Sequence, residues 1–162
     1  MPPSSIFSEM SRFFEAIWPL KEADKKVVTP FVPTDERTTR RYPLVLTTGR
    51  ILSQYNVGAQ TRRTANVAWH DEDVLDIHEA DAEARGITDG SWVTIASRVG
   101  STVMRANVTD RVPPGVVYTT FHFPEHLVNE VTSSECDEDT MCPEYKVVAV
   151  DVERVQRINQ TL

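Results

Sequence analysis

An arginine-rich segment offers the clearest chemistry in the sequence. Between Arg37 and His70 there are six arginines and no acidic residue, although the whole chain has a formal net charge of −7. Within this segment the motif TTGR (Thr47–Arg50) follows an apolar run. It combines two hydroxyls, a glycine that lets the backbone approach a ligand, and a guanidinium suited to phosphate. TTGR alone is more typical of an ordinary turn that ends a strand, but together with the acid-free segment and the motif QTRR (Gln60–Arg63) it indicates an anion site.

The wider composition narrows the classes of ligand and partner. Neither GxGxxG nor GxxxxGK[ST] occurs, so the sequence offers no Rossmann or P-loop nucleotide site. The acidic balance of the chain disfavours nucleic acid as the main partner. No stretch of about 18 apolar residues is present, and the first residues lack the features of a signal peptide. We therefore expect no membrane partner and a cytoplasmic location.

The histidines and cysteines do not form a recognisable catalytic or metal-binding set. His122 and His126 lie four residues apart, but Pro124 between them opposes the helix that such spacing usually needs. Cys136 and Cys142 are separated by five residues, which is not a zinc-knuckle spacing. Structural zinc and a disulfide are the less favoured alternatives to two ordinary thiols. We expect no metal ligands and no catalytic residue in this set.

Short strands dominate the chain after residue 43. One short helix is expected at Glu79–Arg85, with Gly86 as its C-terminal cap, and Arg98–Ser101 is expected to form a hairpin turn. Six or seven short strands with little helix favour a closed, mainly β barrel over a βαβ sheet. The expected strands, all rich in β-branched and aromatic residues, are Leu44–Thr48, Val74–His78, Ser91–Ser97, Thr102–Val108, Val116–Phe121 and Lys146–Val152.

An amphipathic helix is predicted near the N-terminus, at Ile6–Trp18. Its apolar residues, four of them aromatic, recur at helical spacing on one face. We expect this face to pack on the protein's own body, and the alternative is a contact with another chain or copy, which includes self-association. The prolines of residues 19–43 predict an extended connector. The predicted division is 1–41 for helix and connector, 42–152 for the barrel and 153–162 for a tail.

Three stretches together resemble a known domain. They are FVPTDERTTRRYPLVLTTGRILSQYNVGAQTRRT, GITDGSWVTIASRVGSTVMRANVTDRVPPGVVYTTFHFPEHLVNEVT and CPEYKVVAVDV. This combination resembles the C-terminal domain of molybdopterin-dependent formate dehydrogenases, and most of all the catalytic alpha subunit of cytoplasmic, NAD-linked enzymes. The resemblance covers roughly Phe31 to Val152. It implies a six-stranded double-psi β-barrel of the aspartate-decarboxylase-like type, with a short helix and an N-terminal helical and extended arm.

The resemblance also implies a cofactor and its contacts. The cofactor is molybdopterin guanine dinucleotide, in its molybdenum or tungsten form, shared with domains or a chain outside this sequence. An acid-free, arginine-bearing segment suits such a ligand because the cofactor carries pyrophosphate groups. The residues that match the family's contact loops are Thr48, Gly49 and Arg50 after the first strand, Gln54, Tyr55 and Asn56 just beyond, Thr61 and Arg62 later, His122 and Asn129 near the pterin, and Tyr145 and Lys146 in the motif PEYK.

The motifs that carry the family's redox chemistry are absent from the sequence. There is no cysteine motif for an iron–sulfur cluster, no catalytic cysteine or selenocysteine followed by histidine, and no counterpart of the arginine that faces formate. We therefore expect the chain to complete a cofactor site together with the remaining catalytic domains or subunits of a formate dehydrogenase, and not to oxidise formate alone. One alternative is a stand-alone cofactor-binding or assembly module. A less favoured one is a small barrel decarboxylase that cleaves itself at Gly100-Ser101, because a hairpin turn explains that pair more simply.

Overall fold

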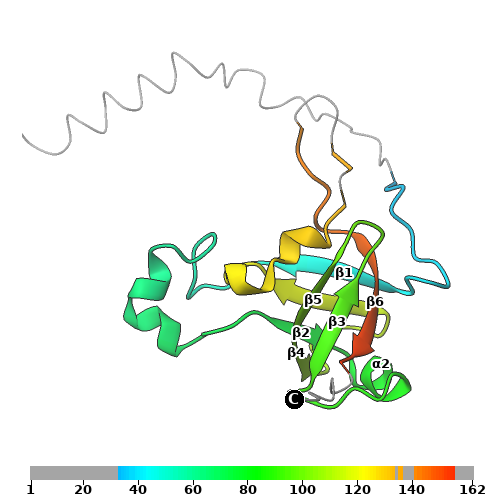
Figure 1. The fold of residues 1–162 in the computed structure, drawn as a ribbon, viewed down its shortest axis with the longest axis horizontal. Helices are drawn as coiled ribbons and strands as arrows, with labels where there is room; N and C mark the ends of the chain where they lie inside the picture. The colour runs from blue at the N-terminus through cyan, green and yellow to red at the C-terminus, as the bar shows by residue number, and fades with distance from the viewer. Residues whose placement is uncertain (1–32, 134, 137–140, 156–162) are drawn as a thin grey trace, which may run out of the picture. The chain divides into compact units, whose positions relative to one another are not determined.

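The computed structural model describes residues 33–133, 135–136 and 141–155. Six strands form a closed barrel in the order β1-β5-β2-β4-β3-β6, and β6 pairs with β1 to close it (Figure 1). The predicted mainly β, six-stranded double-psi barrel is therefore confirmed. The strands are β1 (Leu44–Gly49), β2 (Val74–Ile77), β3 (Trp92–Ala96), β4 (Ser101–Val108), β5 (Val116–Thr120) and β6 (Val148–Arg154).

The pairing directions decide which ends of the strands meet. β1 runs parallel to β5, and β2 runs parallel to β4, whereas the other four pairings are antiparallel. Parallel neighbours present their C-terminal ends at the same edge of a sheet. The residues that follow β1 and β5 therefore lie at one edge of the barrel, although almost seventy positions separate the two strands along the chain.

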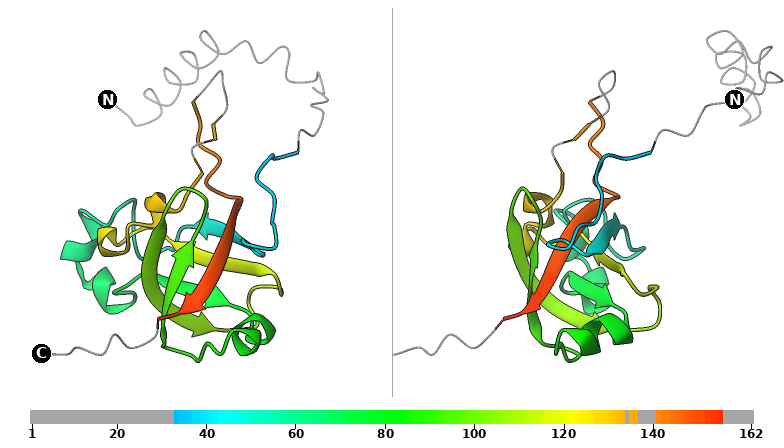
Figure 2. Two further views of the ribbon diagram at one scale, coloured as in Figure 1. Left: turned by 45° about the vertical axis from the view of Figure 1, so that its right-hand side comes forward. Right: turned by 90° about the vertical axis from the view of Figure 1, so that its right-hand side faces the viewer.

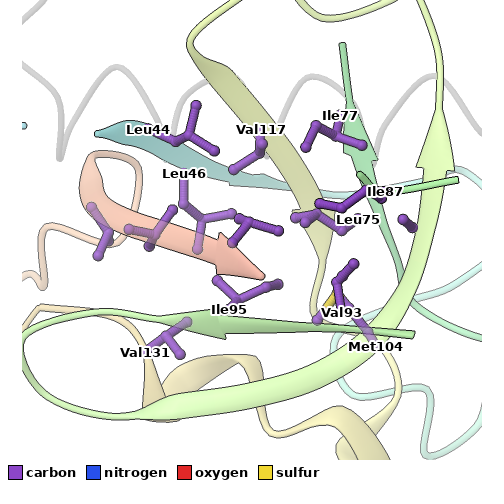
Figure 3. Packing of buried hydrophobic residues seen from close by; sticks show 14 of the residues in the cluster. Leu44, Leu46, Leu75, Ile77, Ile87, Val93, Ile95, Met104, Val117 and Val131 are labelled. Carbon is purple, nitrogen blue, oxygen red and sulfur yellow. The ribbon is translucent and has the colours of Figure 1, made fainter. Parts of the chain in front are cut away.

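Alternating apolar residues fill the barrel interior. In β1 the buried positions are Leu44 and Leu46, and in β3 they are Val93 and Ile95, as the period of two in an extended strand requires. Met104 of β4 joins them in one hydrophobic cluster (Figure 3). Closure of the barrel pairs both edges of every strand, so no edge of the sheet is left open to another chain.

Most predicted boundaries agree with the structure to within two residues. The helix α2 spans Glu79–Ala84, and Gly86 has a φ of 63° just after it, as the predicted cap requires. The last strand begins at Val148 and not at the predicted Lys146, because the side chain of Lys146 is bonded to β1 in the turn that precedes the strand. It continues to Arg154, which lies in register with Val93 of β3.

The remaining elements are short 3-10 helices outside the barrel wall. A long excursion joins β1 to β2 and contains η2 (Thr61–Arg63) and η3 (Ala65–Ala68), which project from one side of the barrel (Figures 1 and 2). Two further turns, η4 (Pro124–His126) and η5 (Val128–Glu130), follow β5. In the part of the chain that the structure describes, no helix is long and apolar enough to cross a membrane.

The predicted N-terminal helix at residues 6–18 and most of the predicted connector lie outside the described residues. The described end of the connector is attached to the barrel through Glu36. Its carboxylate accepts a hydrogen bond from the backbone N–H of Ala149 at 2.9 Å and pairs with Arg98. The barrel thus binds the chain that leads into β1.

Candidate functional site

One pocket of about 490 Å³ brings together residues from five separate segments. It lies where β1 and β5 end, beside the excursion and the turn η5. Five of the predicted site residues line it: Thr48, Arg50, Asn56, Asn129 and Tyr145. Four lining residues were not predicted from the sequence: Val57, Phe121, Thr132 and Pro143. The pocket is therefore assembled by the fold and is not the property of any one motif.

The parallel pairing of β1 and β5 creates the first wall of this pocket. Thr48 lies in register with Thr119, and Gly49 with Thr120. The next residues, Arg50 and Phe121, consequently leave the barrel side by side, and the Arg50 guanidinium lies 5.9 Å from the centre of the Phe121 ring. This arrangement places a cation and an aromatic face next to each other at the mouth of the pocket.

The PEYK segment forms the opposite wall and is bonded directly to β1. The hydroxyl of Thr48 donates a hydrogen bond to the backbone carbonyl of Tyr145 at 2.9 Å. The ammonium group of Lys146 donates to the carbonyl of Thr48 at 2.5 Å and lies 5.4 Å from the Tyr145 ring centre. Lys146 thus attaches the PEYK segment to β1, and Tyr145 lines the pocket.

Gly49 has a packing role beside the pocket. A Cβ atom at this position would lie 2.3 Å from the hydroxyl oxygen and 2.5 Å from Cε2 of Tyr118. Only glycine allows this strand and the Tyr118 ring to approach so closely. The glycine of TTGR therefore makes room for a side chain of this protein.

Three predicted residues of the excursion bond to one another. Gln54 is buried, and its amide accepts from the Thr61 hydroxyl at 2.6 Å and donates to the carbonyl of His70 at 3.2 Å. The same hydroxyl accepts from the backbone N–H of Tyr55 at 3.2 Å, while the Tyr55 side chain is exposed. Gln54 and Thr61 thus fix the shape of the excursion, and their predicted contacts with a cofactor stay a prediction.

Arg62 is engaged by an acid outside the predicted set. Its guanidinium pairs with the Glu125 carboxylate at 2.5 Å and lies 4.9 Å from the centre of the Phe123 ring. The hydrogen bond from Arg62 holds the pKa of Glu125 below its usual value. Arg62 is not among the residues that line the pocket. In this conformation the Arg62 guanidinium, which was predicted to contact the cofactor, is paired with Glu125.

His122 is fully buried behind the pocket and is not among the residues that line it. Its Nε2 atom accepts from the backbone N–H of Ile51 at 3.2 Å, and its Nδ1 atom lies 2.5 Å from the carbonyl oxygen of Asn56. Both ring nitrogens therefore have protein partners. The predicted contact between His122 and a pterin stays a prediction, and the geometry shows a contact with the loop that carries Arg50 and Asn56.

A second pocket, of about 350 Å³, shares Arg50 with the first. Asp76, Asn107 and Tyr118 are among its polar residues, and the Asn107 amide donates to the Asp76 carboxylate at 2.6 Å. Burial, reinforced by the nearby Asp76 carboxylate, raises the pKa of the Tyr118 hydroxyl. Tyr118 therefore stays neutral where exposed tyrosines begin to ionise. Sequence reasoning missed this pocket because its residues come from three strands, β2, β4 and β5, and from the β1–β2 and β4–β5 connections. Which of these segments lie together cannot be read from spacing.

The chemistry of the first pocket favours an anion attached to a planar ring. Its lining includes one cation, Arg50, and no carboxylate, and Arg50 makes no salt bridge among the residues that the structure describes. Hydroxyls and amides supply further hydrogen-bonding groups, and Phe121 and Tyr145 supply aromatic surface. Within the described ranges no three His, Cys, Asp or Glu residues gather as a metal site. The lining therefore has the chemical groups that suit a phosphate-bearing ligand with a flat ring.

Known proteins share the segments that build this pocket. The Molydopterin dinucleotide binding domain matches residues 44–149. The F420-dependent formate dehydrogenase 2 subunit alpha of Methanococcus maripaludis is 42% identical over 122 residues, which are 75% of this chain and 18% of that protein. The corresponding formate dehydrogenase 1 subunit is 38% identical over 126 residues, 77% of this chain and 19% of that protein. The chain thus spans about a fifth of the length of the curated relatives it matches.

A solved structure shows the same fold. Acetylene Hydratase from Pelobacter acetylenicus superimposes with a TM-score of 0.67 over 84% of this chain and 22% of that one, at 14% sequence identity. At such low identity the likeness concerns the fold alone. The family match covers the strands β1 to β5, the first two residues of β6 and every predicted site residue. The chain therefore belongs to the Molydopterin dinucleotide binding domain family.

Proposed function

We propose that this chain binds molybdopterin guanine dinucleotide in the Thr48–Arg50 pocket, as the C-terminal domain or a separate C-terminal subunit of a formate dehydrogenase-like oxidoreductase. One observation carries the proposal. The parallel ends of β1 and β5 and the PEYK wall converge on one pocket inside the segment that matches the family. This pocket has aromatic faces and a cation, Arg50, that forms no ion pair with any residue that the structure describes. Membership of the family and the names of the relatives support the identity of the ligand.

The residues that are present fit such a ligand. The Arg50 guanidinium suits pyrophosphate oxygens, which accept charge-assisted hydrogen bonds. Phe121 and Tyr145 offer faces to a flat ring system, and the Asn56 and Asn129 amides can both donate to and accept from its edges. The Thr48 hydroxyl is already committed to Tyr145, so its share in binding is to hold the wall in place.

In this proposal the chain binds the cofactor, orients it and covers it. When bound, the cofactor supplies redox chemistry at its molybdenum or tungsten ion. The pocket lining contains no cysteine and no general base, so the groups that act on formate belong to other domains or a partner chain. The share of the relatives that this chain spans, about a fifth, supports the same division of work. A cytoplasmic setting stays part of the proposal.

The decarboxylase alternative receives no support from the geometry at Gly100-Ser101. The backbone N–H of Ser97 donates to the carbonyl of Gly100 at 2.8 Å, which closes an ordinary hairpin between β3 and β4. A Cβ atom at Gly100 would lie 2.4 Å from the carbonyl oxygen of Glu130, so close packing explains the glycine. An intact mass of 18.3 kDa for the purified chain is the expected result.

Titration calorimetry with GDP, which carries guanine and a pyrophosphate, tests the proposal. Losing one charge-assisted contact costs about 1.5–3 kcal/mol, so Arg50→Ala should weaken binding about ten-fold to a hundred-fold. Binding to the unchanged chain should weaken as salt is raised. Arg40→Ala is the matched control, because Arg40 is an exposed arginine ahead of the barrel. Equal losses from the two substitutions, or no binding at all, would contradict the proposed site.

A further inference from the structure

We infer that Asp73 and His122 form a buried clamp that holds the Arg50–Asn56 loop in its binding geometry. They act as positioning residues and do not touch the ligand. Both side chains are fully buried, and neither is among the residues that line the pocket. Nothing in their position in the sequence suggests that they act together, since they are separated by 49 positions. The role in binding rests on the proposed function, whereas the clamp itself can be tested without any ligand.

The hydrogen bonds of His122 define its protonation state. A backbone N–H can only donate, so the Nε2 atom that receives the bond from Ile51 carries no proton. A carbonyl oxygen can only accept, so the Nδ1 atom that faces Asn56 carries one. The ring is therefore neutral with its proton on Nδ1.

The two contacts of His122 enclose the part of the loop that faces the pocket. Ile51 directly follows Arg50, and Asn56 itself lines the pocket. Asn56 has a φ of 48°, in the left-handed region that costs most residues about 1–2 kcal/mol but that asparagine tolerates better. Such a conformation persists when surrounding contacts hold it. The hydrogen bond between His122 and the Asn56 carbonyl is one of these contacts.

Asp73 fixes the backbone that carries the His122 ring. Its carboxylate accepts hydrogen bonds from the backbone N–H groups of His122 at 3.2 Å and Phe123 at 2.9 Å, and from the hydroxyl of Thr120. Asp73 also ends the excursion, one residue before β2 begins. Three residues of the excursion, Ile51, Asn56 and Asp73, are therefore hydrogen-bonded to the segment after β5. Loss of the carboxylate would leave buried donors without a partner.

The clamp also supports the wall of the pocket. The centre of the His122 ring lies 5.1 Å from the centre of the Phe121 ring, whose other neighbour is the Arg50 guanidinium at 5.9 Å. A cavity in place of the imidazole would let Phe121 and the loop move together. The clamp therefore determines the position of both the cation and the aromatic face that the proposed ligand requires.

Nuclear magnetic resonance of the unchanged chain tests the clamp directly. Long-range nitrogen–proton correlation should show His122 as the neutral form with its proton on Nδ1. The amide of Ile51 should exchange with solvent far more slowly than that of exposed Leu52, since only the former has a described acceptor. A proton on Nε2, or equally fast exchange at both amides, would overturn the inference whatever the ligand turns out to be.

Matched histidine variants test the positioning role. In His122→Gln the side-chain amide oxygen can replace Nε2 as the acceptor for Ile51, whereas His122→Ala removes both contacts. We expect His122→Ala to weaken GDP binding about ten-fold, and His122→Gln to restore part of that loss. His126→Gln is the control, because His126 bonds to the carbonyl of Val103 at 3.1 Å and lies outside the pocket lining. The affinity of the His126→Gln variant for GDP should stay within about two-fold of the affinity of the unchanged chain.

A double substitution separates positioning from a general loss of stability. If His122 acts by placing Arg50, then Arg50→Ala should cost much less affinity in the His122→Ala background than in the unchanged chain. Fully additive losses would mean that His122 only stabilises the fold. If GDP does not bind the unchanged chain, the proposed function fails, while the protonation and exchange results still decide whether the clamp exists.

Discussion

Thr48 donates its hydroxyl to the backbone carbonyl of Tyr145 at 2.9 Å, and this bond joins two strictly local motifs 97 positions apart. The Lys146 ammonium returns to the carbonyl of Thr48 at 2.5 Å, so the connection is reciprocal. Thr48 is buried, so a Thr48 hydroxyl left without a hydrogen-bond partner would be costly. Strand β1, which ends just before Arg50, is therefore also bonded to the PEYK segment that forms another wall of the pocket.

Thr48→Val tests this bond. Valine has nearly the same shape but no hydroxyl, so the Tyr145 carbonyl loses its donor and the free energy of unfolding should fall by about 1 kcal/mol. Urea denaturation measures the change. Thr47→Val is the control, because Thr47 points to the other side of β1 and makes no described side-chain hydrogen bond. An equal effect of both substitutions would show that the Thr48–Tyr145 bond contributes nothing specific.

Gly49→Ala tests the close approach of β1 to Tyr118. The added methyl group would lie 2.5 Å from Cε2 of the ring, and a clash of this kind in a packed site typically costs about 1–3 kcal/mol. Urea denaturation should show this loss of stability. Combining Gly49→Ala with Tyr118→Ala should cost less than the sum of the two single losses. Simple additivity would mean that the two residues do not meet.

Much of the barrel could be predicted because it is encoded locally. The alternation of apolar residues in strands such as Leu44–Gly49 indicates which side faces the core. Gly86 indicates where the preceding helix ends. The start of β6 was predicted two residues early because Lys146 directly precedes the β-branched pair Val147 and Val148, with no turn residue between them. A contact 98 positions away, between Lys146 and Thr48, determines that the strand starts later.

The site was only partly predictable for a related reason. Motifs identified Thr48, Arg50, Asn56, Asn129 and Tyr145, which share one pocket. They also identified His122 and Arg62, whose side chains meet Ile51 and Glu125 in the structure. A motif records that a position matters but not which partner it meets. Asp73 went unnoticed because an aspartate in an acidic stretch normally faces solvent, and only the fold shows that this one is buried.

Tyr118 should lose its hydroxyl proton at a higher pH than an ordinary exposed tyrosine. Its pKa is raised above the ordinary 10.0 by burial and by the Asp76 carboxylate. The unfolded chain therefore loses this proton at lower pH than the folded chain, and stability should fall as pH rises above about 10. Tyrosinate absorbance and unfolding experiments measure both effects. Tyr118→Phe should abolish this part of the fall, whereas Tyr55→Phe, at an exposed position, should not.

Glu125→Gln should release Arg62 and strengthen the binding of anions. The Glu125 carboxylate holds the Arg62 guanidinium at 2.5 Å, and this bond lowers the pKa of Glu125. The contribution of the pair is therefore present above the ordinary pKa of 4.5 and is lost as pH falls through the lowered value. A neutral amide cannot compete with phosphate for the guanidinium, so GDP should bind a few-fold more tightly, by about two- to five-fold.

Glu153→Gln provides the control for this effect. It removes the same charge from an exposed position at the end of β6, which shares no described side-chain bond with the pocket or with Arg62. Titration calorimetry at constant salt should show a gain for Glu125→Gln only, and the gain should disappear when Arg62→Ala is added. If Glu153→Gln strengthens binding equally, the gain reflects the net charge of the chain and not the release of Arg62. If Arg62→Ala leaves the gain intact, Glu125 opposes the ligand directly, and the pairing of Arg62 with Glu125 has no part in binding.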